Sequence, residues 1–327
     1  MDARERDVAA APQAEPTEGD LQLCVGMATR SGGDEARLAV ESVACQLAAG
    51  DELLIVYTGE DASAPQRLEE TMAAIAPSVQ VLAKYRSGIS EARNVILAAA
   101  RSPFVCFLDD DETAHDGWLE AHRRVWASAP QRLAVVGGPM LPDWNGGRPP
   151  WLRDHLTGVL SVLDLGDEPL VLGRKLGNPP QLRFAWGGNM SMRKSAIVEA
   201  GGFDPDRGAR PEEPYARGEE EELQERLVAC GLEVWYEPSA RVRHHIRQER
   251  LSLDYFRRAM RMHALEDSRK PHALRRGQVR VLRSGARFLV GVVRLDSSER
   301  DVARLGMSYG FALVGGALRA HTGRGRP

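Results

Sequence analysis

The sequence predicts an α/β fold, in which helices cover both faces of a mostly parallel β-sheet and a helical region follows at the C-terminus. Three observations support this prediction. Apolar runs rich in valine, leucine and isoleucine alternate with helix-type patterns between residues 21 and 128, this alternation stops at residue 139, and arginine-rich amphipathic patterns follow residue 251. Repeated strand–helix units form parallel sheets with two buried faces.

The strand–helix units follow one another along the chain. Each apolar run is a predicted strand, and the segment after it is a predicted helix. The strand and helix pairs are 21–28 and 35–48, 52–57 and 65–75, 79–83 and 90–100, and 104–108 and 117–128. Such sheets bind ligands beyond the carboxyl ends of their strands. We therefore expect the loops after Ala28, Tyr57, Ala83 and Leu108 to line one cleft.

The second half of the domain is less regular. Residues 139–180 are rich in proline, glycine and tryptophan, which predicts a long structured excursion over the cleft. Regular signals return as predicted helices at 194–200 and 219–230 and a predicted strand at 233–236.

Composition sets the domain organisation. With 43% hydrophobic residues, the 327-residue chain can bury one full domain and leave about 80 residues for an appendage. The first residues are charged or small and contain almost no bulky apolar side chain, which excludes a signal peptide. We therefore expect a disordered tail at 1–19, an α/β domain at 20–250 and a basic helical region at 251–327, in a cytoplasmic protein.

The cysteines Cys24, Cys45, Cys106 and Cys230 lie far apart, and three of them are in apolar runs. This spacing favours reduced core thiols over disulfides or zinc ligands.

Charge is distributed unevenly along the chain. Residues 241–327 contain 20 Arg or Lys against 7 Asp or Glu, whereas residues 1–240 contain 23 against 39. A basic appendage on an acidic body favours a polyanionic partner. The apolar and arginine pattern at 255–265, 279–295 and 302–318 predicts amphipathic helices on an anionic membrane, at the inner face of the cell membrane. The alternatives are helices that pack on the α/β domain or form a homodimer. Nucleic acid is not expected, because no recognition motif accompanies the charge.

Four consecutive acids, Asp109 to Glu112, follow the predicted buried strand 104–108. Like charges at a strand end that opens into a cleft are commonly compensated by a divalent cation, and oxygen ligands select Mg²⁺ or Mn²⁺. The alternative is an exposed acidic turn or helix cap.

A second acidic run, 219–222, opens a predicted helix. The helix dipole favours acids in a first turn, so a structural role explains this run equally well. Beside a metal–diphosphate site, however, such a carboxylate is well placed to accept a proton from an attacking hydroxyl group.

In order and spacing, the chain from about residue 21 to 258 resembles family 2 glycosyltransferases of the inverting, GT-A-fold type. The segments that carry the resemblance are GISEARN at 88–94, FLDDDE at 107–112 with WL at 118–119, GGNM at 187–190 with GGFD at 201–204, GEEEEL at 218–223, and YEP at 236–238 through His244. The resemblance implies a Rossmann-like GT-A domain that moves a sugar from a nucleotide-diphosphate sugar to a hydroxyl acceptor, with Mn²⁺ or Mg²⁺ as cofactor.

The resemblance assigns the metal site. Asp109 and Asp111 correspond to the outer acids of the Asp-x-Asp motif, with Asp110 between them. Asp111 is expected to bind the metal directly and Asp109 to lie near the donor ribose or the metal. His244 falls where some relatives place a further metal ligand or a diphosphate contact, and Arg250 is expected to help neutralise the diphosphate.

The catalytic base of the family corresponds to Glu220, where aspartate is usual. Because acids surround this position, Glu219 remains the alternative base.

Further correspondences concern the donor. Gly88, Arg93 and Asn94 match the loop that approaches the donor, with a surface or ion-pair role as the alternative for Arg93. Gly188 and Asn189 match a loop near the sugar and acceptor.

The nucleotide end of the donor site departs from the family pattern. Thr29 keeps a small polar side chain near the base. An acidic pair common after the second strand is replaced, so Tyr57 is a candidate to stack on the base and Asp61 to contact it. The donor is left open among UDP-, GDP- and dTDP-linked sugars, and the acceptor among glycans, lipid-linked saccharides and small natural products.

Two other functions fit part of the pattern. A sugar nucleotidyltransferase would also use acids and Mg²⁺, and the loop 30–33 is a partial version of the glycine-rich basic loop it needs. A catalytically inactive module that binds glycans or nucleotide sugars would explain the departures at Tyr57 and Glu220. Retention of both acid clusters argues against it.

Overall fold

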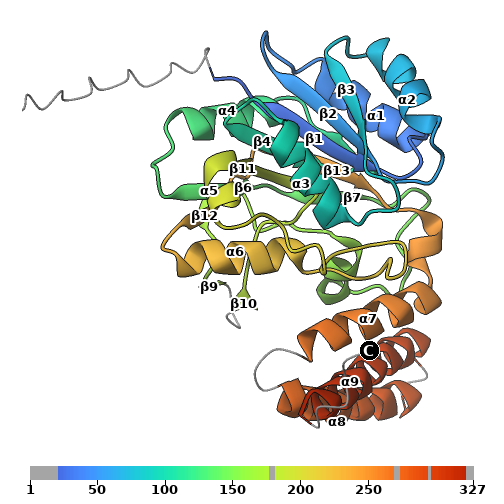
Figure 1. Ribbon diagram of the computed structural model, residues 1–327. Coiled ribbons are helices and arrows are strands. Elements are labelled where there is room, and N and C mark those ends of the chain that lie inside the picture. The colour runs from blue at the N-terminus through green and yellow to red at the C-terminus, as the bar shows by residue number, and fades with distance from the viewer. Residues whose placement is uncertain (1–20, 177–180, 269–272, 294–295, 322–327) are drawn as a thin grey trace, which may run out of the picture.

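The computed structural model describes residues 21–176, 181–268, 273–293 and 296–321. Figure 1 shows an α/β body with a group of helices, coloured orange to red, at one end. The tail expected at residues 1–19 lies outside the described residues.

Within the described residues, the body is built on an eight-stranded sheet with the strand order β3-β2-β1-β4-β11-β6-β12-β8. The pairs β2–β3, β1–β2, β1–β4 and β6–β12 are parallel. Strand β11 runs antiparallel between β4 and β6, and β8 is antiparallel to β12 at the edge. The strands are β1 (Cys24–Thr29), β2 (Glu52–Tyr57), β3 (Val79–Ala83), β4 (Phe104–Leu108), β6 (Leu133–Gly137), β8 (Leu170–Val171), β11 (Asn189–Arg193) and β12 (Glu233–Tyr236).

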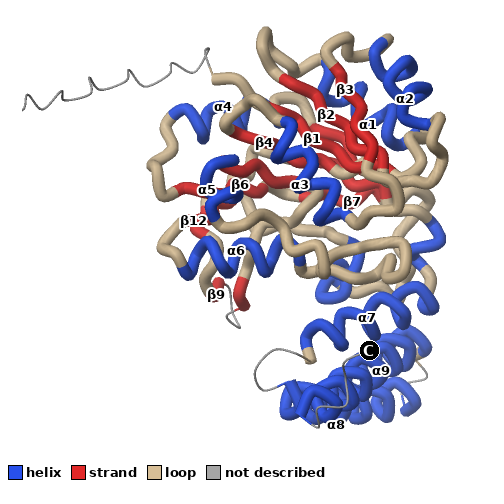
Figure 2. Tube along the Cα trace, viewed as in Figure 1, coloured by secondary structure: helices blue, strands red, loops and turns tan. Residues whose placement is uncertain are grey.

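Two apolar clusters cover the two faces of this sheet, as expected for parallel strands buried on both sides. One cluster contains residues of α1, α2 and α4, and the other contains residues of α3, α5 and α6. Figure 2 shows the strands in red enclosed by these helices. The helices are α1 (Asp34–Ala44), α2 (Ala64–Ala73), α3 (Ile89–Ala99), α4 (Trp118–Ala127), α5 (Lys194–Glu199) and α6 (Glu219–Ala229).

The predicted strand–helix units are confirmed, but two central strands were not predicted. Strand β6 is a fully buried apolar run, like β4, but no helix-type pattern follows it, so the alternation gave no signal. Strand β11 (NMSMR) lacks β-branched residues, although its first four residues are buried.

The predicted excursion at 139–180 contains β7 (Met140–Asp143), the 3₁₀ helix η2 (Asp154–Leu160), β8 and β9 (Lys175–Leu176), which pairs with β10 (Gln181–Leu182). Strand β7 also joins β5 (Glu112–Ala114) and β13 (Val242–His245) in a small sheet of order β5-β13-β7. The register of this sheet places His244 opposite Glu112. It therefore brings the end of the domain next to the acidic run that follows β4.

The C-terminal region begins with η3 (Gln248–Leu251) and forms α7 (Leu253–Asp267), α8 (Ala273–Val293) and α9 (Ser297–His321). Helices α7 and α9 pack on η2 through an apolar cluster that includes Leu156, Leu160, Phe256, Met260 and Val302. The predicted helices are therefore confirmed, and part of their apolar surface packs on the body. Among the described helices, none combines the length and apolarity needed to cross a membrane.

The cysteines are all free. Cys24 and Cys106 are buried as expected, whereas Cys45 and Cys230 are exposed. The prediction of core thiols therefore holds for two of them. Cys45 and Cys230 immediately follow the last turns of α1 and α6 and so face solvent.

Candidate active site

The acidic run lies where β4 ends. The strand is fully buried, and a turn in which the Glu112 amide donates to the Asp109 carbonyl (3.2 Å) carries the chain away from it. The amide of His245 donates to the carbonyl of Asp111 (2.9 Å), which ties β13 to this turn. Loop residues after β4 and side chains of β13 therefore share one site.

Asp111 contacts two basic side chains. Its Oδ2 lies 3.4 Å from Nε2 of His244 and 3.0 Å from Nη1 of Arg250. Nη1 of Arg250 also lies 3.2 Å from Nε2 of His244. Depending on the tautomer, Nε2 of His244 either donates a hydrogen bond to the Asp111 carboxylate or accepts one from the Arg250 guanidinium. Burial opposes ionisation of Asp111, but the hydrogen bond and charge of His244 and the charge of Arg250 outweigh it and hold the pKa of Asp111 well below its usual range.

These side chains fit a divalent cation that a substrate helps to hold. Across the described parts of the chain, no group of three or more His, Cys, Asp or Glu side chains forms a closed metal site. Asp111 and His244 could supply one oxygen and one nitrogen ligand, and the guanidinium of Arg250 already places positive charge beside both. Mg²⁺ is commonly bound by one or two carboxylates together with substrate phosphates. The expected metal ligands Asp111 and His244 are thus adjacent, whereas Asp109 is paired elsewhere.

Asp109 and Glu219 share a buried arginine. Arg93, in the middle of α3, donates from Nη1 to Glu219 Oε1 (2.7 Å) and from Nη2 to Asp109 Oδ1 (3.3 Å). Its guanidinium also lies over the rings of Phe107 and Phe203. Burial opposes its charge, but the carboxylates raise the pKa of Arg93 above its usual value. Arg93 therefore has the ion-pair role, and it joins two acidic runs that are far apart in the sequence.

Glu219 and Glu220 have different environments. Glu219 is buried against Arg93, whereas Glu220 lines a pocket of about 200 Å³. Oε2 of Glu220 is buried and has no hydrogen-bond partner among the residues that the structure describes. Burial and the neighbouring Glu219 carboxylate raise the pKa of Glu220 well above its ordinary value, although Arg93 opposes this shift. A carboxylate in this setting is a stronger base than an ordinary glutamate.

Residues of the α/β body and of the C-terminal region line the pocket next to Glu220. Its lining includes Trp186 from the body, Arg250 from η3, and Tyr255 and His263 from α7. Arg250 also donates from Nε to the hydroxyl group of Tyr255 (3.2 Å). The C-terminal helices therefore contribute to the site.

The nucleotide end of the expected cleft is arranged differently from the prediction. Thr29 donates to Oδ2 of Asp110 (2.6 Å), which points Asp110 toward β1. Burial raises the pKa of Asp110 to about 7, although the Thr29 hydrogen bond opposes this shift. Asp61 is paired with Arg67 (2.6 Å) beside the start of α2, and it is exposed. Both acids therefore already have partners within the fold.

Tyr57 is buried, so the expected stacking of its ring on a base is not supported. A side chain at Gly59 would collide with its hydroxyl group, and its ring lies edge-to-face with that of Tyr85, with the ring centroids 6.2 Å apart. Tyr85 is 46% exposed in the loop after β3. Sequence reasoning missed this residue, although its place after a strand of the predicted sheet was a signal for it.

Three residues expected near the donor or the sugar have internal roles. The side chain of Asn94 exchanges two hydrogen bonds with the backbone of Phe203 (2.8 and 2.9 Å). Asn189 is fully buried, accepts from Trp118 Nε1 (2.8 Å) and donates to the carbonyls of Pro139 (2.9 Å) and Ala240 (2.7 Å). Gly88 is the N-cap of α3, and its amide donates to Glu91 (3.2 Å). The amide groups of both asparagines therefore have hydrogen-bond partners within the fold.

Glu112 is a buried carboxylate that the sequence did not single out. Within the described part of the chain, neither of its side-chain oxygens has a hydrogen-bond partner, and a Cβ at Gly188 would lie 2.5 Å from them. Burial and the nearby charges of Asp109 and Asp111 raise the pKa of Glu112 well above its usual value. Gly188 therefore leaves space for this carboxylate beneath the metal-binding candidates.

Replacing Asn189 by alanine is expected to lower the free energy of unfolding by about 3 kcal/mol, because Trp118 Nε1 and two backbone carbonyls lose their partner inside the protein. Urea unfolding followed by circular dichroism measures this change. The exposed Gln66 provides a control, since Gln66→Ala should stay within about 0.5 kcal/mol of wild type. Equal effects of the two substitutions would contradict the structural role of Asn189.

The chain is similar to a known protein family and to known structures. Residues 24–200 match the family described as Glycosyl transferase family 2. A glucosyl-dolichyl phosphate glucuronosyltransferase of Haloferax volcanii is 26% identical over 217 residues, which are 66% of this chain and 66% of that protein. A pre-mycofactocin glycosyltransferase of Mycobacterium tuberculosis is 32% identical over 167 residues, which are 50% of this chain and 32% of that protein. The chain thus spans about two thirds of the first relative and about a third of the second.

A solved structure shows the same fold. The structure of GalNAc-T7 with UDP, GalNAc and Mn²⁺ matches with a TM-score of 0.52 at 15% identity, over 76% of this chain and 50% of that chain. The likeness concerns the fold, which is that of GT-A glycosyltransferases, and it confirms the expected fold class.

Proposed function

The chain belongs to glycosyl transferase family 2, and we propose that it transfers a sugar from a nucleotide-diphosphate sugar to a hydroxyl group, with inversion at the anomeric carbon. The observation that carries this proposal is the buried bridge from Asp109 through Arg93 to Glu219. It holds the acidic turn after β4 next to the start of α6. A place for a charged diphosphate therefore adjoins a place for a base.

In this proposal, Glu220 is the catalytic base and Glu219 positions it. Of these two residues, only Glu220 lines the pocket, while Glu219 is held by Arg93. The acceptor oxygen forms a bond to the anomeric carbon, the bond from that carbon to the diphosphate oxygen breaks, and the acceptor proton passes to Glu220. A single displacement of this kind inverts the anomeric configuration.

The acidic turn would hold the diphosphate end of the donor. Asp111 and His244 would bind the divalent cation, Mn²⁺ or Mg²⁺, with Asp109 beside them. The structure of GalNAc-T7, which has a similar fold, was solved with Mn²⁺, and this supports a divalent cation here. When bound, the cation neutralises charge on the departing nucleoside diphosphate. Arg250 adds a second positive charge at the same place, because it contacts both Asp111 and His244.

The nucleoside end of the donor is assigned to the loops after β1, β2 and β3. Tyr85 takes the stacking role first considered for Tyr57, because it is the exposed partner of that aromatic pair. Aromatic stacking tolerates any base, which agrees with a donor that the sequence leaves open among UDP-, GDP- and dTDP-linked sugars.

The pocket beside Glu220 is the proposed acceptor site. Its wall from α7 includes Tyr255 and His263, so the C-terminal helices take part in acceptor choice. The Haloferax relative, which matches over most of this chain, is named for glucosyl-dolichyl phosphate. We therefore take a lipid-linked saccharide as the acceptor to test first, with glycan and small-molecule acceptors as the alternatives.

A panel of UDP-, GDP- and dTDP-linked sugars, incubated with the protein and Mn²⁺ or Mg²⁺, tests this function by release of free nucleoside diphosphate. One donor is expected to react, and a chelator is expected to stop the reaction. Binding without release from any donor would identify an inactive binding module. Release of pyrophosphate from a nucleoside triphosphate and a sugar phosphate would identify a nucleotidyltransferase.

A further inference from the structure

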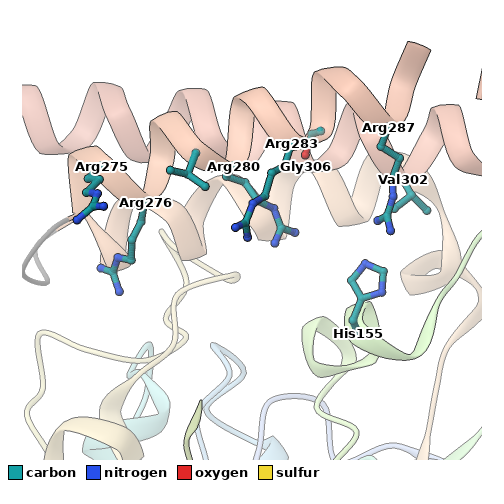
Figure 3. A pocket seen from close by; sticks show the side chains of 10 residues that line it. His155, Arg275, Arg276, Arg280, Arg283, Arg287, Val302 and Gly306 are labelled. Carbon is teal, nitrogen blue, oxygen red and sulfur yellow. The ribbon is translucent and has the colours of Figure 1, made fainter. Parts of the chain in front are cut away.

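Helix α8 and η2 enclose a groove of about 730 Å³ that lies outside the pocket beside Glu220. Figure 3 shows arginine side chains along one side of α8, with Arg287 nearest to His155 of η2. The arginines that line the groove are Arg275, Arg276, Arg280, Arg283 and Arg287. Helix α8 contains no Asp or Glu, so every charged side chain of this helix is an arginine in the groove.

Most of these arginines have no carboxylate partner in the described part of the chain. Arg287 pairs with Glu299 (3.2 Å), and the same glutamate lies 3.9 Å from Arg153. Among the described residues, no ion pair is found for the other four groove arginines. Burial and the charges of Arg287 and Arg280 lower the pKa of His155, which indicates a positive potential across the groove.

An apolar stripe runs along α8 beside the arginines. Leu282 and Leu289 are seven residues apart, so they share one face of the helix, and they are 73% and 65% exposed. Val279 and Val290 add exposed apolar surface on the side nearer the arginines. A helix that exposes large apolar side chains next to basic ones has the composition of a helix that lies at a membrane interface.

The side of α8 that contains Gly277 packs closely against α9. Gly277 of α8 and Gly310 of α9 lie so close that a Cβ on either one would be 3.0 Å from the carbonyl oxygen of the other. A Cβ at Gly306 of α9 would collide with the side-chain hydroxyl group of Ser284 of α8. Since α9 also packs on η2, the arginines and the apolar stripe are presented at fixed positions relative to the body.

We propose that α8 is a membrane-docking element, in which the arginine groove binds the phosphates of anionic lipid headgroups while Leu282 and Leu289 enter the acyl boundary. This arrangement also orients the acceptor pocket. Helix η2 contributes His155 to the groove and Gly158 and Val159 to the pocket beside Glu220. A docked membrane would therefore lie within a few residues of that pocket. The docking rests on α7 to α9 and η2 alone, so it stands whether or not the protein transfers sugars.

Vesicle co-sedimentation of the full chain tests the docking element. The probes are phosphatidylcholine vesicles and vesicles that contain phosphatidylcholine and phosphatidylglycerol in equal parts, at low and high salt. Wild type is expected to bind only the anionic vesicles. Arg275→Gln with Arg283→Gln is expected to weaken this binding about 30-fold, from the usual contribution of two basic residues near an anionic surface. Neither arginine has an ion pair among the described residues, so the thermal midpoint should not change.

Two further variants separate the contributions. Leu282→Gln with Leu289→Gln should remove the part of the binding that persists at high salt, because apolar burial is not screened. Arg37→Gln with Arg132→Gln removes the same number of charges from the body and should bind like wild type. The proposal fails if wild type ignores anionic vesicles, if the groove variant binds like wild type, or if the control loses as much binding. It also fails if free inorganic diphosphate binds the groove and vesicles do not.

Discussion

Glu220→Gln is expected to reduce kcat for glycosyl transfer by about 10²- to 10⁴-fold, the usual effect of removing a general base. The amide keeps the shape of the side chain but cannot accept the acceptor proton. Steady-state kinetics with the donor identified by the panel measure the loss. Stability should be maintained, because Oε2 of Glu220 has no partner to lose and Glu220 is adjacent to the negative charge of Glu219.

Glu219→Gln provides the matched comparison, since both positions open α6. Here the buried Arg93 loses one of its two carboxylates, so the midpoint of thermal unfolding should fall. Activity should fall less than in Glu220→Gln. If Glu219→Gln abolished transfer at full stability while Glu220→Gln stayed active, the roles of the two residues would be exchanged.

The pH profile gives a second readout of Glu220. The base must be ionised to work, and its pKa is raised by burial and by Glu219, so kcat/KM should fall as the pH drops through this raised value. This acidic limb should lie above the range in which an ordinary glutamate titrates. In Glu219→Gln the limb should move to lower pH, because the neighbouring negative charge is gone. An unchanged limb would show that another group controls it.

Asp111→Asn is expected to lower kcat/KM by at least about 10²-fold and to weaken Mn²⁺ binding, because the amide removes the charge that attracts the cation. The fold should persist, since asparagine still accepts from Arg250. Mn²⁺ binding is measured by electron paramagnetic resonance with and without a nucleoside diphosphate, which gives a readout independent of turnover. Binding should be tighter with the diphosphate, because the protein supplies only part of the ligand set.

Asp116→Asn is the control for this substitution. Asp116 is exposed in the turn after β5, and the exchange has the same effect on net charge. It should leave both Mn²⁺ binding and transfer unchanged. Equal Mn²⁺ affinity in Asp111→Asn and Asp116→Asn would contradict the assignment of Asp111 as a ligand.

The sequence predicted the parts of the fold whose signal is local. Strands β1 to β4 are apolar runs followed by helix-type patterns, so their position and parallel pairing could be read directly. Strand β11 could not be predicted in this way, because it pairs with β4 and β6, which lie far from it along the chain. The small sheet that brings His244 opposite Glu112 was not predicted for the same reason.

The charged residues of the candidate site could be recognised in the sequence, whereas the contacts of several neutral ones could not. Acid runs after a strand and at a helix start are visible without a structure. Their connection through Arg93 is not, because it joins positions 16 and 126 residues away from it. Asn94 and Asn189 resemble ligand contacts in sequence, yet both satisfy the hydrogen bonds of buried backbone or of Trp118. Burial decides between these roles, and it emerges only from the assembled fold.

The order of strands in the sheet has a consequence for recombining this protein with its relatives. The family match ends at residue 200, yet β12 (233–236) lies inside the sheet, between β6 and β8. A chimera joined at residue 200 would pair β6 with a strand of the relative instead of β12 and would separate Arg93 from the native Glu219. A crossover near residue 250, after β13, keeps both intact. The unit that can be exchanged is therefore longer than the segment that sequence similarity marks out.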